Sequence, residues 1–524
     1  MSSEVGAGGR LGAVIRERVR GGVLGSLTDS TLVLLALTAA GAALRFPTLD
    51  VQSLWLDETF TANLLDHSLG EMLGKLADSE SAPPLYYVLA WGWTQLWGID
   101  EVALRSLSAL LGTAMIPLAG AAAAKLTTQR IGLVTAALVA VNPLLVWFSQ
   151  EARVYALFAF LSTVSLLAFA AALRDPIPRR IAWWALASAV TIAAHYFAAF
   201  LALPQAVLLA RAATDRRVVY AATAAVAAVA GVQVPLALHQ RSFGTFWITE
   251  NPLIERIADT GVQFLVGPAV PAPVVIGPIA ALLALFGAWL LQSRAEGAER
   301  RGAAIGAIVG VTAIAAPLVL SLAFDVFLQK ARIGAWLPLT VIPAAGYGAL
   351  RAGQLGLAVA GAACVLGVAV VVATAATPEL QREDWRGAAK SLGRSPTPTV
   401  LLLNPLEAAG PGEGELGIGY YLHAAEATGF RTRTREVALL SHEDSGLDAQ
   451  IRGVPELPAV GIPPGFRLVE RVETKRYTLL RYEASRQRSI TGWARQVREE
   501  LKAAGRGSTG ALEIPGNAAR REPR

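Results

Sequence analysis

The sequence has little cysteine and little charge. Its 524 residues include one cysteine, Cys364, and only 16% of them are charged. A single cysteine cannot form a disulfide within the chain, so no disulfide framework holds the fold and nothing in it depends on an oxidising compartment. In contrast, 54% of the residues are hydrophobic and the mean hydropathy is +0.46. These values exclude an ordinary soluble protein of this length and predict a polytopic membrane protein.

Lysine is also scarce, because only six of the 46 basic residues are lysines. Usage this rich in arginine and alanine indicates a GC-rich bacterial genome, so we expect a protein of the bacterial plasma membrane. Four N-terminal arginines precede a segment without a clear cleavage site, and we expect no cleavable signal peptide. The net charge of +6 is modest, and we expect no nucleic-acid partner.

Twelve apolar segments lie in the first 376 residues and define the membrane region. They are 29–45, 83–98, 101–124, 131–149, 154–173, 181–195, 197–211, 218–238, 273–292, 302–323, 336–350 and 355–376. Basic clusters lie at the N-terminus and around Lys125, Arg174, Arg211, Arg294 and Arg351. The positive-inside rule predicts that all of them are cytoplasmic.

Segment 83–98 is the exception among the twelve. It is short, begins with two prolines and contains five tyrosine or tryptophan residues. Such aromatic density favours the lipid–water boundary, so we place this segment along the outer surface. About eleven transmembrane helices result, with the N-terminus cytoplasmic and the C-terminus outside. Each arm of hairpin 181–211 has about 15 residues, fewer than a full membrane crossing needs. The chain is therefore predicted to turn around His195, at or below the outer surface.

The outer loop 46–82 is the main candidate for chemistry. It carries seven acidic residues and one lysine, and long loops beside rigid spans are often functional. Asp57 and Glu58 follow Leu54-Trp55-Leu56 in this loop. The alternative is that these two acids cap a helix at the membrane surface.

Further charged residues lie at predicted outer span ends, where they are costly unless paired or hydrated. Glu151 and Arg153 occupy a short turn before Tyr155, and Lys330 and Arg332 lie in loop 324–335. The alternative for the first pair is a local ion pair, and for the second pair it is snorkelling towards lipid headgroups. For His195 the alternative is a structural role.

The composition changes after Thr377, which predicts a small extracytoplasmic α/β domain over 377–484. Thr399–Leu403 is predicted to be a buried strand, and 466–471 with 476–482 to form a hairpin. An amphipathic helix is predicted to open at Glu383. We find no glycine-rich phosphate loop, no Cys/His metal spacing and no Ser/His/Asp arrangement, so we expect no catalytic groups in this domain.

The sequence thus divides into four predicted parts. These are a basic cytoplasmic segment 1–28, a transmembrane catalytic domain 29–376, the α/β domain 377–484, and a segment 485–524. In the last part we predict a basic helix over 487–503 and disorder from 505 onwards.

Several motifs together resemble bacterial membrane glycosyltransferases of the GT-C type, in glycosyltransferase family 39. This family includes protein O-mannosyltransferases and lipid A aminoarabinose transferases. The matching runs are Leu54-Trp55-Leu56-Asp57-Glu58, Pro83-Pro84-Leu85-Tyr86-Tyr87, Ala103-Leu104-Arg105, Ser149-Gln150-Glu151-Ala152-Arg153-Val154-Tyr155, Phe246-Trp247-Ile248 and Glu383-Asp384-Trp385-Arg386. Two positions depart from the family pattern, with Ala82 in place of a histidine and Arg332-Ile333-Gly334 in place of Arg-Tyr-Leu.

The resemblance implies a GT-C fold, a polyprenyl-phosphate sugar donor used on the outer face, and Asp57 as the catalytic acid residue. The acceptor is a lipid, a glycan or a protein, and the sugar is mannose-like or another. Catalytic candidates are Asp57, Glu58 and Glu151. Substrate-binding candidates are Arg153, Tyr155, Arg332, Lys330, Arg105, Tyr86, Tyr87 and His195.

Chemistry suggests how these residues would act. The acceptor hydroxyl must lose a proton, which requires a general base, and the lipid phosphate leaves with negative charge that cations stabilise. A divalent metal is possible but not required. The competing hypothesis is a transporter or flippase of lipid-linked sugars, which would place its charges near the bilayer midplane in two related halves. A structural scaffold would leave the acidic loop unexplained.

Overall fold

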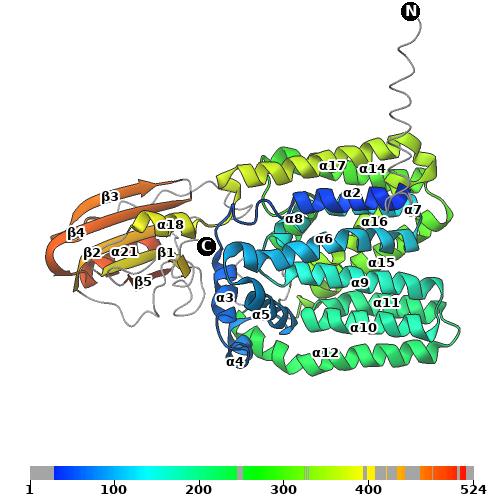
Figure 1. Ribbon diagram of the computed structural model, residues 1–524, viewed down its shortest axis with the longest axis horizontal. Coiled ribbons are helices and arrows are strands. Elements are labelled where there is room, and N and C mark those ends of the chain that lie inside the picture. The colour runs from blue at the N-terminus through cyan, green and yellow to red at the C-terminus, as the bar shows by residue number, and fades with distance from the viewer. Residues whose placement is uncertain are drawn as a thin grey trace, which may run out of the picture.

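The computed structural model describes residues 29–244, 252–323, 325, 327, 330–393, 398–406, 420–421, 433–442, 461–474, 476–503 and 508–514. In these residues, a bundle of long helices is joined at one end to a small sheet (Figure 1). The predicted N-terminal segment 1–28 and the motif Phe246-Trp247-Ile248 lie outside the described residues.

Each of the twelve predicted apolar segments forms a helix, and 131–149 forms two. The helices are α2 (Asp29–Ala43), α5 (Leu85–Trp97), α6 (Glu101–Leu126), α7 (Gln129–Val141), α8 (Pro143–Ser149), α9 (Tyr155–Arg174), α10 (Pro178–Ala194), α11 (Ala198–Ala212), α12 (Arg216–Gly244), α14 (Pro273–Arg294), α15 (Gly297–Leu320), α16 (Trp336–Gly348) and α17 (Gly353–Ala376). Five shorter helices lie between them: α3 (Leu56–Leu65), α4 (Leu69–Ser79), α13 (Leu253–Val266) and the 3-10 helices η3 (Lys330–Ala335) and η4 (Leu350–Ala352).

Six of the described helices are long and apolar enough to cross a membrane, which makes the chain a multi-pass membrane protein. A seventh span results if α7 and α8, which meet at an angle of 56°, count as one. The break follows from Pro143, which starts α8, and from Asn142, whose side chain caps α8 by accepting from the Leu145 N–H at 3.1 Å. The predicted number of eleven is not confirmed, because helices such as α2 and α11 have only 15 residues.

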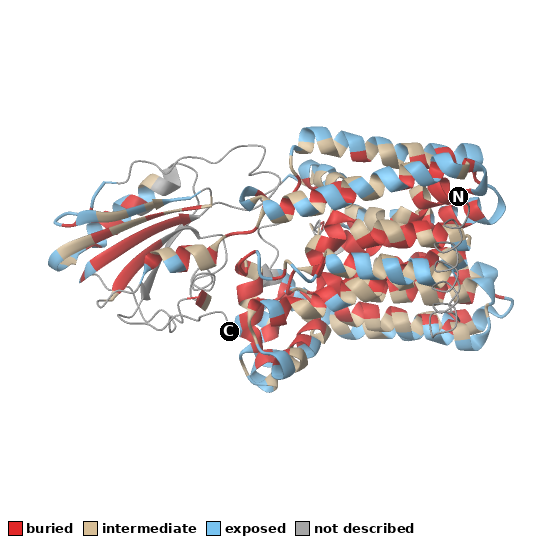
Figure 2. Ribbon diagram, turned by 45° about the horizontal axis from the view of Figure 1, so that its top comes forward, coloured by how far each residue is buried: buried red, intermediate tan, exposed pale blue. Residues whose placement is uncertain are grey.

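Burial separates central from peripheral helices (Figure 2). In the most apolar stretch of each helix, 56% of α6 and 61% of α9 is buried, against 6% of α12. Helices α6 and α9 therefore form the centre of the bundle. The exposed apolar side chains of α12 and α14, such as Val232 and Val274, form a surface suited to lipid.

Three of the loops that carry basic residues lie together at one end of the bundle. Arg130 donates to the Gly353 carbonyl oxygen at 2.7 Å, and the Leu350 N–H donates to Glu299 at 3.1 Å. These bonds bring together the α6–α7, α14–α15 and α16–α17 connections. The opposite end carries α3, α4 and α5 beside the sheet (Figure 1). The positive-inside rule still predicts that the first of these ends is cytoplasmic.

The C-terminal part is a five-stranded sheet of order β3-β4-β2-β1-β5, in which only β1 and β2 are parallel. Its elements are α18 (Trp385–Leu392), β1 (Thr399–Leu406), β2 (Arg433–His442), β3 (Arg467–Glu473), β4 (Tyr477–Ser489), α21 (Thr491–Ala503) and β5 (Ser508–Ile514). The strand at 399, the hairpin β3–β4 and the helix that opens near Glu383 are as predicted.

Two expectations for the C-terminus are wrong. Residues 508–514 are not disordered, because they pair antiparallel with β1 and cover its edge. The domain also does not end at 484. Strand β4 continues to Ser489, and Trp493 of α21 packs edge-to-face on Tyr482 with ring centroids 5.6 Å apart.

Candidate functional site

Helix α3 presents Asp57 and Glu58 in its first turn, and the two side chains have different surroundings. Glu58 caps the helix: the Trp55 N–H donates to its Oε2 at 3.3 Å. The capping alternative therefore holds for Glu58. Asp57 points elsewhere and remains 31% exposed, whereas Glu58 is fully buried.

Glu58 forms a buried ion pair with Arg105 of α6. Arg105 donates from Nε and Nη2 to the two carboxylate oxygens at 2.8 and 2.5 Å, and the Ala152 N–H donates to Oε1 at 2.8 Å. Burial alone would raise the pKa of Glu58, but the guanidinium of Arg105 holds that pKa below its ordinary value. Arg105 also donates to the carbonyl oxygens of Leu49, Gln52 and Ser53 at 2.7–2.8 Å. The pair thus anchors the outer loop to the bundle.

Asp57 lies between two cations. Its Oδ2 is 3.5 Å from Lys330 Nζ of η3 and 4.0 Å from Arg153 Nε. The fold therefore brings together three sequence-predicted residues that are up to 273 positions apart in the numbering. A partly exposed carboxylate in this position is open to a substrate and can accept a proton from it.

Arg153 is oriented by Glu80, which the sequence analysis did not single out. Its Nη1 and Nη2 donate to Glu80 Oε1 and Oε2 at 2.7 and 2.9 Å, and Nη1 also donates to Thr61 Oγ1 at 3.1 Å. Glu80 was only one of seven acids in the outer loop, and nothing local distinguished it. The alternative of a local ion pair between Arg153 and Glu151 does not hold, because each side chain has a different partner.

Glu151 pairs with Arg382, which lies in the segment between α17 and α18. Arg382 Nη2 donates to Glu151 Oε2 at 2.7 Å, and both side chains are buried. Burial raises the pKa of Glu151 above its ordinary value, although Arg382 and Lys330 oppose this effect. Glu151 Oε1 is buried and has no hydrogen-bond partner among the described residues.

Lys330 and Arg382 are both close to Trp55, the residue before α3. Lys330 Nζ lies 4.0 Å from the centre of its ring, and the Arg382 guanidinium carbon lies 6.0 Å away. Lys330 therefore bridges the Trp55 ring and Asp57, which differs from the snorkelling alternative.

All four aromatic candidates are buried. Tyr86 and Tyr87 are buried edge-to-face neighbours with ring centroids 5.3 Å apart. Burial raises the pKa of Tyr87, so its phenol stays neutral. Tyr155 packs on Phe148 at 5.0 Å. His195 is buried and stacks on Phe158 at 4.4 Å, an arrangement that fits its structural alternative.

Arg332 belongs to a second basic cluster rather than to the Asp57 contacts. It donates to Thr260 Oγ1, and its guanidinium carbon lies 3.2 Å from the centre of the Phe327 ring. Nearby, Arg256 of α13 pairs with Asp325 at 2.6 Å. Burial and the neighbouring Arg256 guanidinium lower the pKa of Arg332 to about 9. Both guanidinium groups contribute positive charge to this region, which Asp325 partly offsets at Arg256.

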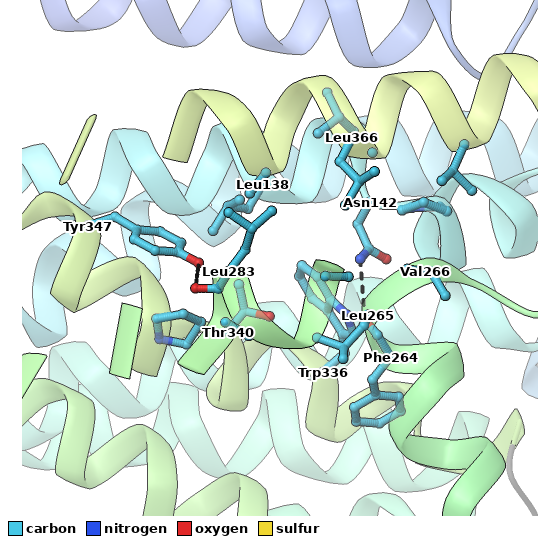
Figure 3. Close-up of a pocket in the computed structure, with 18 residues that line it drawn as sticks. Leu138, Asn142, Phe264, Leu265, Val266, Leu283, Trp336, Thr340, Tyr347 and Leu366 are labelled. Atoms are coloured by element: carbon cyan, nitrogen blue, oxygen red, sulfur yellow. Dashed lines mark hydrogen bonds between the residues drawn. The ribbon is translucent and has the colours of Figure 1, made fainter. Parts of the chain in front are cut away.

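An apolar cavity of about 110 Å³ lies next to this cluster, between α7, α13, α14, α16 and α17 (Figure 3). Trp336 lines it directly after η3, and its Nε1 donates to the Phe264 carbonyl oxygen at 2.9 Å. Phe264 lies one turn of α13 beyond Thr260, the residue that binds Arg332. Helix α13 therefore connects the basic cluster to the cavity.

No group of three histidine, cysteine or acidic side chains in the described part of the chain is arranged to hold a metal ion.

Comparisons with known proteins identify the fold. No family model matches the sequence, and no curated protein matches it. The crystal structure of ArnT from Cupriavidus metallidurans in the apo state superposes with a TM-score of 0.53 and 12% identity, over 87% of this chain and 98% of that chain. The chain has the GT-C fold.

Two other structures are less similar. ArnT bound to undecaprenyl phosphate has a TM-score of 0.48 at 14% identity, with the same coverage of both chains. The apo oligosaccharyltransferase from Archaeoglobus fulgidus has a TM-score of 0.47 at 12% identity, over 69% of this chain and 57% of that chain. The predicted GT-C fold is confirmed, and membership of family 39 is not.

Proposed function

We propose that this GT-C chain is a membrane glycosyltransferase that transfers a sugar from a polyprenyl-phosphate donor to a hydroxyl of a lipid, glycan or protein. The observation that carries this proposal is the position of Asp57. It is a partly exposed carboxylate in the first turn of α3, held between Lys330 and Arg153. Helix α3 lies at the end of the bundle beside the sheet, where lipid headgroups would lie (Figure 1).

Asp57 is suited to act as the general base. The acceptor oxygen attacks the anomeric carbon while its proton passes to Asp57, and the bond from that carbon to the phosphate oxygen breaks. The electron pair leaves with the lipid phosphate, whose growing charge Lys330 can stabilise. A single displacement of this kind inverts the anomeric configuration. Glu58 and Arg105 then have positioning roles, because each is already paired inside the protein.

A lipid monophosphate fits the surroundings of this carboxylate. Arg332 provides a guanidinium group for a phosphate, whereas Arg256 is already paired with Asp325. The adjacent apolar cavity can receive part of a lipid chain. ArnT, which shares the fold, has been solved with undecaprenyl phosphate bound, and this analogy of fold agrees with the proposal. A nucleotide sugar would need a diphosphate cradle, which the sequence lacks.

The second candidate function is a transporter or flippase of lipid-linked sugars. Such proteins place charges near the bilayer midplane, in two related halves. The Asp57, Lys330 and Arg153 cluster instead lies at helix ends, beside α3 and η3. This position favours chemistry at the surface over passage through the membrane.

The donor class can be tested with purified protein in liposomes. Cell-envelope extract serves as acceptor, and the donors compared are isotope-labelled polyprenyl-phosphate sugars and soluble nucleotide sugars. We expect label transfer only from the polyprenyl-phosphate pool. Efficient transfer from a nucleotide sugar in the absence of polyprenol contradicts the proposal. Movement of the lipid-linked sugar across the bilayer without transfer supports the flippase instead.

The cavity offers a separate test with a matched control. Ala284 lines the cavity, whereas Leu282 of the same helix is 66% exposed on the lipid-facing surface. Ala284→Phe should fill the cavity and raise the donor concentration needed for half-maximal transfer. Leu282→Phe adds a ring outside the cavity and should leave that concentration unchanged. Equal behaviour of the two variants removes the cavity from the lipid-binding proposal.

A further inference from the structure

Arg382 reaches the candidate site from a part of the chain that does not belong to the membrane bundle. It lies after α17, in the short segment that leads to α18 and the C-terminal sheet. Its side chain nevertheless turns towards the bundle. Nη1 donates to the Gln150 carbonyl oxygen at 3.1 Å, Nη2 donates to Glu151 Oε2 at 2.7 Å, and the guanidinium carbon lies 4.2 Å from the centre of the Trp147 ring.

The same segment is fixed to the loop that carries Asp57. The Arg382 N–H donates to Gln52 Oε1 at 2.9 Å, and the Ser53 hydroxyl donates to the Glu383 carbonyl oxygen at 2.5 Å. Further along the chain, Tyr421 accepts from the Leu54 N–H at 2.7 Å. Three consecutive residues before Trp55 are therefore held by the C-terminal part of the chain.

Glu151 is the side chain through which Arg382 can influence chemistry. One carboxylate oxygen is held by Arg382, while Oε1 is buried without a hydrogen-bond partner among the described residues. A buried acceptor left open in this way is suited to a substrate hydroxyl. The other charged groups that act on Glu151 are Lys330 of η3, and Asp57 and Glu58 of α3.

We propose that Arg382 is a positioning residue of the transfer site, which acts by holding the Glu151 carboxyl group aimed at the substrate. The proposal rests on the glycosyltransferase function above and deepens it, because it makes the C-terminal segment part of the site. Without Arg382, Lys330 is the one remaining cation among the described groups that act on Glu151, and it is shared with Asp57. The pKa of Glu151, which burial already raises, would rise further.

The test compares Arg382→Gln with Arg386→Gln in the full-length protein. Arg386 also ties this segment to the bundle, because it pairs with Glu101 at 2.6 Å and donates to the Asp50 carbonyl oxygen at 2.8 Å. No contact joins it to Glu151. For each variant, kcat for sugar transfer from labelled undecaprenyl-phosphate sugar to cell-envelope extract is measured in buffers from pH 5 to pH 9.

We expect Arg382→Gln to lower kcat by roughly 10²-fold at neutral pH and to shift the acidic limb of the pH profile to higher pH. Arg386→Gln should leave the limb where it is in the wild type. Arg382→Lys keeps the charge but not the planar stacking. It should therefore return the acidic limb of the pH profile to its wild-type position and restore part of kcat. An unshifted limb in Arg382→Gln overturns the inference.

A second comparison keeps the inference testable if Arg382→Gln does not fold. Glu151→Gln leaves Arg382 buried without its carboxylate partner, whereas Glu151→Gln combined with Arg382→Met leaves no unpaired buried charge from this pair. If Arg382 acts through Glu151, these two variants should have the same kcat within about threefold. A much lower kcat in the double variant contradicts that route. A wild type that transfers no sugar from any polyprenyl-phosphate donor instead overturns the proposed function.

Discussion

Replacement of Glu58 by its amide should lower the free energy of unfolding far more than replacement of the neighbouring Asp57 by its amide. Glu58→Gln preserves size but removes the negative charge opposite Arg105, and both side chains are essentially inaccessible to solvent. Breaking a buried pair in this way costs about 3–5 kcal/mol. Asp57→Asn alters contacts of 3.5 and 4.0 Å at a side chain that is 31% exposed, so it should cost only about 0–1 kcal/mol.

Removing both members of the buried pair should not restore stability. Arg105 also donates to three backbone carbonyl oxygens of the outer loop, those of Leu49, Gln52 and Ser53. An apolar replacement would leave these carbonyls without their donors, at about 1–3 kcal/mol for each buried group. Glu58→Gln combined with Arg105→Met should therefore be no more stable than Glu58→Gln alone.

The assay is thermal unfolding of purified protein in detergent, followed over a range of pH. The arginine holds the pKa of folded Glu58 below its unfolded value, so the pair contributes stability that is present above the unfolded pKa and is lost as the pH falls through the folded pKa. The gap between wild type and Glu58→Gln should therefore narrow below about pH 4. Equal unfolding midpoints for Glu58→Gln and Asp57→Asn at neutral pH would refute the anchoring role.

The remaining predictions concern the cations and the orientation. Arg153→Lys cannot keep both bonds to Glu80, so transfer should fall about 10-fold or more with little change in the unfolding midpoint, and full activity would contradict this. Arg332→Ala should raise the KM for the donor more than that for the acceptor, and an equal change in both would argue against a phosphate site. With Cys364 replaced by serine, cysteines at the exposed positions Ser79 and Gln129 should differ in intact cells. An impermeant thiol reagent should label only position 79, and the reverse pattern would invert the topology.

The helices could be predicted from sequence because each depends on a local run of apolar residues. All twelve apolar segments are helical, and even the break within 131–149 falls at Pro143, a residue visible in the sequence. The number of spans could not be fixed in the same way, because hydrophobicity does not determine how far a 15-residue helix such as α2 reaches into the bilayer. Strand β5 was missed because it forms by pairing with β1 over a distance of more than 100 residues.

Only part of the candidate site could be predicted from the sequence, because its contacts join residues that are far apart in the chain. The motifs indicated Asp57, Arg153 and Lys330, and the fold places each of the two cations within 4.0 Å of Asp57. Sequence shows charge but not burial, so Glu58 and Arg105 could not be recognised as an internal anchor. Arg382 was missed because its importance lies in a contact across 231 positions of sequence.

The most direct test of the proposed function is the rate of sugar transfer by Asp57→Asn. The variant should be purified, shown to have an unfolding midpoint close to that of the wild type, and assayed in liposomes with a polyprenyl-phosphate sugar donor. Asparagine keeps the shape of aspartate but cannot accept the acceptor's proton, so the initial rate should fall by roughly 10²-fold or more. A folded Asp57→Asn variant with a rate near that of the wild type would contradict the assignment of Asp57 as the base.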